Sequence, residues 1–69
     1  MLINGQEVNI AKRRLEVVRK DGSGKFLSQA DVAKYCGVSV TAEQRYENET
    51  TKNPKPEVLE RLAEILEIE

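Results

Sequence analysis

The chain has 69 residues, of which 39% are hydrophobic and 33% are charged, and its formal net charge is -1. This length allows one hydrophobic core, because folded units rarely fall much below about 50 residues, so we expect a single domain over residues 1–69. The balance of apolar and charged residues excludes an intrinsically disordered chain and a membrane-embedded one.

Cysteine and histidine usage limits the chemistry further. The single cysteine, Cys36, cannot form a disulfide within the chain, and without histidine the sequence lacks the ligands for a zinc site. We expect Cys36 to be a small buried apolar residue. No apolar run approaches the about 20 residues of a membrane helix, and no signal peptide opens the chain, so we expect a cytoplasmic protein with no membrane partner.

Charge is distributed unevenly along the chain. A phosphate backbone could therefore contact one end of the domain, although the net charge alone argues mildly against a nucleic-acid partner. The alternative is that both charge runs are ordinary solvated helix faces. The basic run in the first third comprises Lys12, Arg13, Arg14, Arg19, Lys20 and Lys25, and the acidic run near the end comprises Glu57, Glu60, Glu64, Glu67 and Glu69.

The first expected elements are a turn and a helix. Asn4-Gly5 between apolar residues favours a tight turn, with a short strand or hairpin around it. From Val8 onward apolar residues recur at steps of three and four, which predicts a helix over about residues 8–21. Two glycines then end the pattern in a loop over residues 21–24. The expected inward face of this helix is Val8, Ala11, Leu15 and Val18.

A short second helix is expected over about residues 29–36. Ser28 is placed to cap its first turn, and Asp31 resembles the second half of a capping box. Gly37 follows where a left-handed residue would end the helix, because glycine adopts that conformation without a side-chain clash. The expected inward face is Val32, Ala33 and Cys36.

Two more helices follow. Ser39 can cap a third helix over about residues 40–48. Prolines then exclude a helix until Pro56, whose restricted backbone suits the first position of a fourth helix over about residues 56–68. The expected core face of the fourth helix is Leu59, Leu62, Ala63 and Leu66.

The second and third helices, joined by Gly37-Val38-Ser39, form the pattern of a helix-turn-helix. Residues 29–39 resemble the signature of Cro, lambda-repressor and Xre-type regulators, and the likeness extends over about residues 8–66. It implies an all-α, compact four- to five-helix lambda-repressor-like bundle with room for a short N-terminal strand. The residues that carry it are Leu27-Ser28-Gln29 at the helix opening, Ala33 at the crossing, Gly37 in the turn and Arg45-Tyr46-Glu47-Asn48 at the end of the third helix.

The resemblance implies a function. Members of this family bind double-stranded DNA in the major groove, which implies a bacterial or phage transcriptional repressor or regulator that works as a homodimer. No cofactor, metal or small-molecule substrate is implied. Catalysis is not expected, because the sequence has no histidine, no glycine-rich phosphate loop and no cluster of carboxylates.

The exposed residues of the third helix are the expected base readers. Arg45 could form a fork of hydrogen bonds to guanine, Gln44 could pair with adenine, Val40 could meet a thymine methyl and Thr41 a base or a phosphate. Phosphate contacts are expected from groups at helix ends and in loops. These are Ser28, Gln29, Ser39, Asn48 and Lys52.

Two features need a structural answer. The family often links its first helix to the end of the third by an arginine and a glutamate, which implies a pair between Arg19 and Glu47. Glu43 stands where the family nearly always has isoleucine or valine facing the core, and an unpaired buried carboxylate is costly. We therefore expect that Glu43 reaches solvent, or that the third helix is rotated or starts later, capped by Thr41 with Ala42 turned inward.

Two other functions compete with this one. An acidic chain with a weakly basic third helix also suits a protein-interaction module, such as an antirepressor or adaptor, that keeps the fold but binds DNA weakly or not at all. Residues 37–41 are also similar to MerR or excisionase proteins, although a fourth helix without a wing argues against them. A homodimer is expected at this size, with Leu2, Ile3, Ile65 and Ile68 as its candidate surface.

Overall fold

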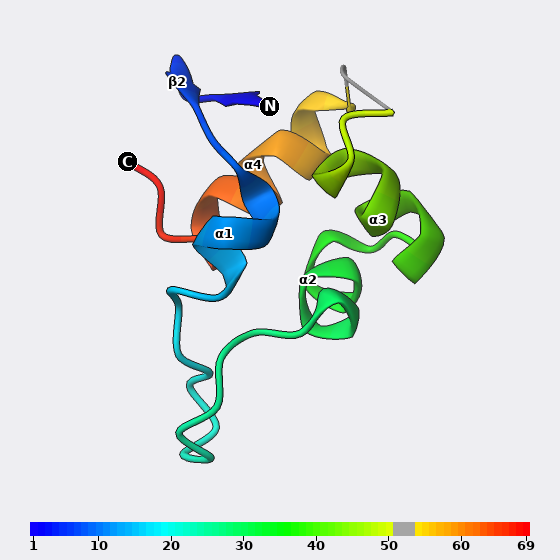
Figure 1. Cartoon of the computed structure of the whole chain (residues 1–69). Helices are drawn as coiled ribbons and strands as arrows, with labels where there is room; N and C mark the ends of the chain where they lie inside the picture. Colours follow the sequence, from blue (N-terminus) through cyan, green and yellow to red (C-terminus); the bar gives the residue numbers. More distant parts are fainter. Residues whose placement is uncertain (51–53) are drawn as a thin grey trace.

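The computed structural model of the chain describes residues 1–50 and 54–69 and is mostly helical, as the sequence predicted (Figure 1). Its described helices are preceded by a small two-stranded sheet. None of the helices in these two stretches has the length and apolar character needed to cross a membrane. In chain order the elements are β1 (Leu2–Ile3), β2 (Gln6–Glu7), α1 (Ile10–Arg14), α2 (Gln29–Cys36), α3 (Val40–Glu47) and α4 (Pro56–Ile65).

The N-terminal sheet is a hairpin, which confirms the strand expected around Asn4-Gly5. β1 and β2 pair antiparallel, with Leu2 opposite Glu7. Asn4 and Gly5 both have positive φ, 51° and 77°, the backbone that a tight hairpin turn requires. Ile3 is 1% exposed and belongs to the core. The Ile3 side chain is therefore buried in the core of its own chain, which corrects its placement on a dimer surface.

The first helix is much shorter than the predicted 8–21. Asn9 caps α1 by accepting a hydrogen bond from the backbone N–H of Lys12, and the helix ends at Arg14. Leu15 and Val18, expected in the core, are 55% and 48% exposed, whereas Val17 is buried. The inward face predicted for this helix is therefore wrong beyond residue 14.

The reason lies in contacts distant along the chain. After α1 the backbone becomes extended, and Val18 forms a bridge with Phe26. The N–H of Arg19 donates to the carbonyl of Lys25 at 2.7 Å and the N–H of Leu27 to that of Val17 at 3.1 Å. Adjacent β-branched residues favour this extended backbone over a helix. We call residues 17–27 the 17–27 connection; it extends away from the helices at the bottom of Figure 1.

The fourth helix also ends earlier than predicted, at Ile65 rather than residue 68. Glu67 takes a left-handed backbone with φ 55°, and the N–H of Ile68 donates to the carbonyl of Ala63 at 2.9 Å. This is the hydrogen-bond pattern of a Schellman end, which stops a helix. Arg13 reinforces it from α1, because its guanidinium donates to the carbonyls of Leu66 (2.8 Å) and Glu67 (3.1 Å).

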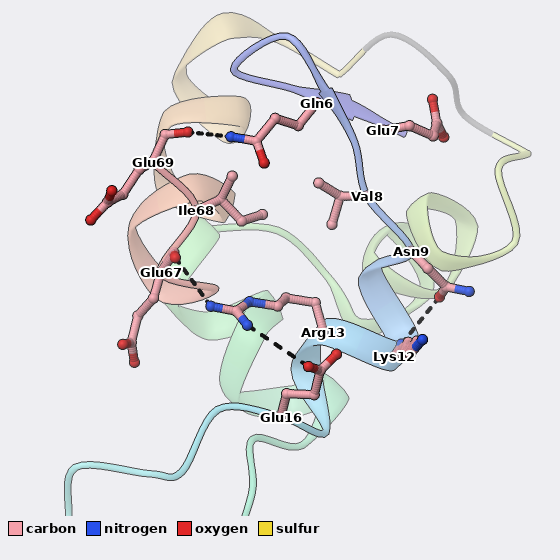
Figure 2. A pocket seen from close by; sticks show the side chains of 10 residues that line it. All are labelled: Gln6, Glu7, Val8, Asn9, Lys12, Arg13, Glu16, Glu67, Ile68 and Glu69. Atoms are coloured by element: carbon pink, nitrogen blue, oxygen red, sulfur yellow. Dashed lines mark hydrogen bonds and ion pairs between the residues drawn. The ribbon is translucent and has the colours of Figure 1, made fainter.

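The same contacts define an open hollow between β2, α1 and the end of α4 (Figure 2). Gln6 reaches across it to the backbone carbonyl of Glu69, and Arg13 crosses beneath to Glu67. Lys12 and Arg13 share the lining with several glutamates, so the hollow has no dominant charge. We regard it as the seam that joins the two ends of the chain.

The core is built where α2, α4 and the N-terminal segments meet. Val32 of α2 and Leu62 of α4 are fully buried, and Ile10 of α1 is 2% exposed. Half-buried apolar residues, including Val38 and Cys36, pack around them. This apolar centre holds α2 in place, and α2 in turn carries α3.

Candidate nucleic-acid interface

The two ends of α2 have the capping residues that the sequence indicated. The Ser28 hydroxyl accepts the N–H of Asp31 at 3.1 Å, and the Asp31 carboxylate accepts the N–H of Ser28 at 2.8 Å. That backbone hydrogen bond, followed by the Ser28 hydroxyl and the charge of Arg19, lowers the pKa of Asp31. At the other end Gly37 has φ 70°, and Val38 donates its N–H to the carbonyl of Ala33 at 3.0 Å. The backbone groups at both ends of α2 are therefore hydrogen-bonded by residues close to them in the sequence.

α3 begins at Val40, directly after its cap. The hydroxyl of Ser39 accepts the N–H of Ala42 at 3.1 Å. Thr41 does not cap the helix, so the expectation of a later start is wrong. Ala42 does pack against the core, half-buried, but without any shift of the helix.

One side of α3 is exposed, and it carries the residues expected to read bases. Residues four apart are neighbours on a helix surface, so two such pairs at adjacent positions cover one broad side of α3. The opposite side is buried, with Tyr46 8% and Glu43 0% exposed. The four exposed residues are Val40, Thr41, Gln44 and Arg45.

The expected phosphate contacts are placed less uniformly. Ser28 and Ser39 sit at the first turns of α2 and α3, and each hydroxyl accepts a backbone N–H. A hydroxyl that accepts one hydrogen bond still has its own hydrogen to donate. Asn48 is exposed at the far end of α3, where it forms the C-cap. Lys52 lies outside the described residues.

Gln29 lies between α2 and α3 and is already engaged. Its amide nitrogen donates to Glu47 at 2.8 Å, and its amide oxygen accepts from Gln44 at 3.1 Å. Gln29 thus braces α3, one half of the role that the family resemblance implied. The contact also fixes the side chain of Gln44, one of the exposed residues of α3.

The ion pair that holds the end of α3 is not the predicted one. Arg14, not Arg19, contacts Glu47, at 3.3 Å, and both side chains are largely buried. Arg19 pairs instead with Asp31 at 2.7 Å. The reason is the early end of α1: Arg14 lies in the helix that packs on α3, while Arg19 lies in the 17–27 connection beside the start of α2. Sequence reasoning missed Arg14 because it rested on a longer first helix.

The expectation that Glu43 reaches solvent is wrong. Its side chain is fully buried, and among the described residues no donor reaches either carboxylate oxygen. Burial, followed by the neighbouring carboxylate of Glu47, raises the pKa of Glu43 to about 8, although Arg14 acts in the opposite direction. Below that pH Glu43 is a neutral acid that can donate its proton to Glu47.

Burial of both glutamates changes the charge of the exposed side of α3. Within this helix, which is described in full, no carboxylate is exposed, because Glu43 is buried and the Glu47 side chain is 7% exposed. Arg45 remains exposed there, and Lys34 is exposed on α2. The acidic residues of α4 lie on its solvent side. The exposed side of α3 therefore carries a positive charge and no carboxylate.

Glu49, which follows α3, has a structural partner that the sequence did not suggest. Its φ is 59°, a left-handed backbone that glycine adopts more easily. Its carboxylate accepts a hydrogen bond from the ammonium group of Met1 at 2.8 Å. Glu49, followed by Glu7, raises the pKa of that ammonium group. The contact ties the end of α3 to the N-terminal hairpin.

Comparison with known families matches residues 27–69 to a family model described as helix-turn-helix. The match covers more than half of the chain, including α2, α3 and α4, and omits the N-terminal strands and α1. Searches of curated proteins and of solved structures returned no match.

Proposed function

Since the chain belongs to the helix-turn-helix family of the Cro/C1, Xre-like type, which is a family of DNA-binding regulators, we propose that it binds double-stranded DNA sequence-specifically and represses or regulates transcription. The family is one of regulatory rather than catalytic domains. The observation that carries the proposal is the exposed side of α3, which presents Arg45 and polar side chains and no carboxylate. A helix with this surface can approach phosphates without charge repulsion.

Base reading is assigned to the four exposed residues of α3. Arg45 has the planar donor fork that matches O6 and N7 of guanine in the major groove. Gln44 can offer a donor and an acceptor to adenine, and its bond to Gln29 holds its direction. Val40 and Thr41, in the first turn, present methyl groups to thymine, and Thr41 adds a hydroxyl.

Phosphate contacts are assigned to groups at the helix ends and in loops. Ser28 and Ser39 can each donate a hydroxyl hydrogen outward, and the first turns of α2 and α3 add free backbone N–H groups. Gln29 and Asn48 complete this set, together with Lys52. These groups position the helix on the duplex, while α3 specifies the sequence.

A homodimer is part of the proposal. One small module reads few base pairs, and two copies on half-sites one helical turn apart would read a two-fold symmetric site. Exposed Leu2 and half-buried Ile65 and Ile68 remain candidates for its surface, since Ile3 belongs to the core of its own chain. We propose that this dimer acts in the cytoplasm.

One observation favours a second candidate, a protein-interaction module that keeps the fold. The solvent side of α4 is acidic, and it suits a basic protein surface better than DNA. The exposed residues that make it so are Glu57, Glu60 and Glu64 on the helix and Glu67 just after its end. The two candidates differ in their response to salt, because phosphate binding releases counterions and weakens steeply as salt rises.

The test is selection of bound duplexes from a random pool at two salt concentrations, followed by affinity measurement of Arg45→Ala and Arg61→Ala on the selected site. Arg61 is an exposed arginine on α4, so its replacement makes the same charge change away from α3. We expect Arg45→Ala to lose about 1 to 3 kcal/mol of binding free energy and to tolerate substitution at one base pair. Arg61→Ala should bind nearly as the wild type does. Equal binding by the wild type and Arg45→Ala would remove the assignment of α3.

A further inference from the structure

Glu43 is an ionisable residue in a fully buried position, and among the described residues no donor is hydrogen-bonded to its carboxylate. Both of its carboxylate oxygens lack a donor among residues 1–50 and 54–69. Glu47, one helical turn further along α3, is the acidic neighbour that raises the pKa of Glu43, and its ionised carboxylate is only an acceptor. A hydrogen bond between the two acids therefore requires one proton, which Glu43 can supply.

The charges around this pair do not offset the cost of ionising both acids. α3 packs on α1 and α2. From α1 the facing charge is Arg14, whose guanidinium contacts Glu47 and the carbonyl of Leu27 and whose buried Nε has no partner among the described residues. From α2 the facing titratable group is Cys36, whose pKa is raised to about 11 by burial and then by Glu43, so its thiol stays neutral. Among these described groups, one cation serves two carboxylates.

The buried acid is connected to the exposed side of α3 through Glu47. Glu47 accepts from Gln29 at 2.8 Å, and Gln29 accepts from Gln44 at 3.1 Å. A second acid that ionises beside Glu47 would repel it and draw Arg14 away from it. Either change disturbs the contact that orients Gln29, and through it the side chain of Gln44.

We propose that Glu43 is a positioning residue that holds α3 against α1 and α2 only as a neutral acid, so that its ionisation loosens α3 and weakens DNA binding as the pH rises above neutrality. The DNA part of this inference rests on the proposed function, whereas the ionisation of Glu43 and the loosening of α3 do not.

The sign of the pH dependence follows from linkage. The pKa of Glu43 is about 8 in the folded chain and 4.5 in its ordinary environment, so the folded state keeps a proton that the unfolded state has lost in between. Stability from this group is fully present below 4.5, falls as the pH rises toward about 8 and then levels off. The chain has no histidine to add a side-chain titration of ordinary pKa in this range.

The experiment compares the wild type with Glu43→Gln, whose neutral amide can donate to Glu47 at any pH. Thermal unfolding is followed by circular dichroism between pH 6 and pH 9.5, and affinity for the selected duplex is measured at the same values. We expect wild-type affinity to be about tenfold weaker at pH 9 than at pH 7, since one pH unit above the pKa leaves about a tenth of the acid protonated. Glu43→Gln should change less than about twofold. The Met1 ammonium group titrates in both proteins, so the difference between them reports on Glu43.

A measurement on the wild type alone applies even if the variant does not fold. The side-chain carboxyl carbon of Glu43, followed by NMR in the wild type, should titrate near 8. Titration near the ordinary 4.5, or parallel pH profiles of melting and binding in the two proteins, would overturn the inference. If neither protein bound DNA at any pH while their melting profiles still diverged, the proposed function would fail and the ionisation of Glu43 would stand.

Discussion

α3 and α4 both pack on α2, and they do so with opposite chemistry. α4 buries an apolar stripe that includes Val58, Leu62 and Ala63, and its acidic residues face solvent. α3 buries Tyr46 and Glu43 and is held at its end by the polar contacts of Glu47. The apolar contacts of α4 do not depend on pH. The attachment of α3 depends on the protonation of Glu43 and on the hydrogen bonds of Glu47 to Arg14 and Gln29.

This difference fits the proposed roles of the two helices, in which α3 contacts DNA and α4 stabilises the fold. A helix that reads DNA must keep a polar exposed side, so few of its positions remain for core packing. α3 spans Val40–Glu47, about two turns. A helix this short is stable mainly because it packs against other helices, here α2 and α1. α4 can be anchored hydrophobically because none of its residues is assigned to the base-reading surface.

The largest expected effect comes from breaking the apolar attachment. Leu62→Ala removes a fully buried side chain and should cost about 2 to 5 kcal/mol of unfolding free energy. In a domain this small that loss approaches the total stability. Urea unfolding followed by circular dichroism measures it, and Leu15→Ala, at a residue 55% exposed, is the matched control with an expected cost within about 0.5 kcal/mol. Equal costs in the two variants would show that α4 is not held by this stripe.

A smaller effect is expected from breaking the polar attachment. Glu47→Ala removes the carboxylate that accepts from Arg14 and Gln29, although Arg14 keeps the carbonyl of Leu27, and it should cost about 1.5 to 3 kcal/mol. It also frees Arg14 to neutralise Glu43, so stability should fall less between pH 4.5 and about 8 than in the wild type. Urea unfolding at several pH values measures both effects. Arg19→Ala is the comparison, because its pair with Asp31 is more exposed and is worth about 0 to 1 kcal/mol. A larger loss in Arg19→Ala than in Glu47→Ala would contradict the assignment of Arg14 as the partner that matters.

The smallest effect is expected in the turn that joins α2 to α3. Gly37→Ala places a side chain on a residue with φ 70°, which should cost about 1 to 2 kcal/mol. Apart from its chain neighbours, no atom of the described residues lies within 4 Å of the added carbon, so the cost comes from the backbone conformation. Asparagine tolerates this conformation, and Gly37→Asn should therefore lose less in the same unfolding measurement. A greater loss with asparagine would show that the side chain, and not the backbone, sets the cost.

The parts of the fold that the sequence predicted closely are those whose causes are local. The capping box of Ser28 and Asp31, the left-handed Gly37 and the Ser39 cap each act within a few residues, and the structure has α2 and α3 where these signals indicated. The first helix was predicted from apolar spacing alone, and that spacing continued past Arg14 although the chain became extended. The bonds that decide this join residues on opposite sides of a glycine-containing loop.

The candidate site shows the same division. The residues exposed on α3 followed from helix periodicity, so Val40, Thr41 and Arg45 lie where expected. The partner of Glu47 did not follow, because the choice between Arg14 and Arg19 depends on where α1 ends. Glu43 was recognised as anomalous, but its burial as a neutral acid requires knowledge of every group that surrounds it.

The sequence by itself determined the helix-turn-helix: capping, glycine conformation and helix period act over a few residues, and a local pattern carries them completely. Only the tertiary structure decided the extended path of the 17–27 connection and the set of charges enclosed between α1, α2 and α3. The physical reason is that backbone pairing and desolvation depend on which distant segments meet, and a carboxyl group's protonation depends on what replaces its water.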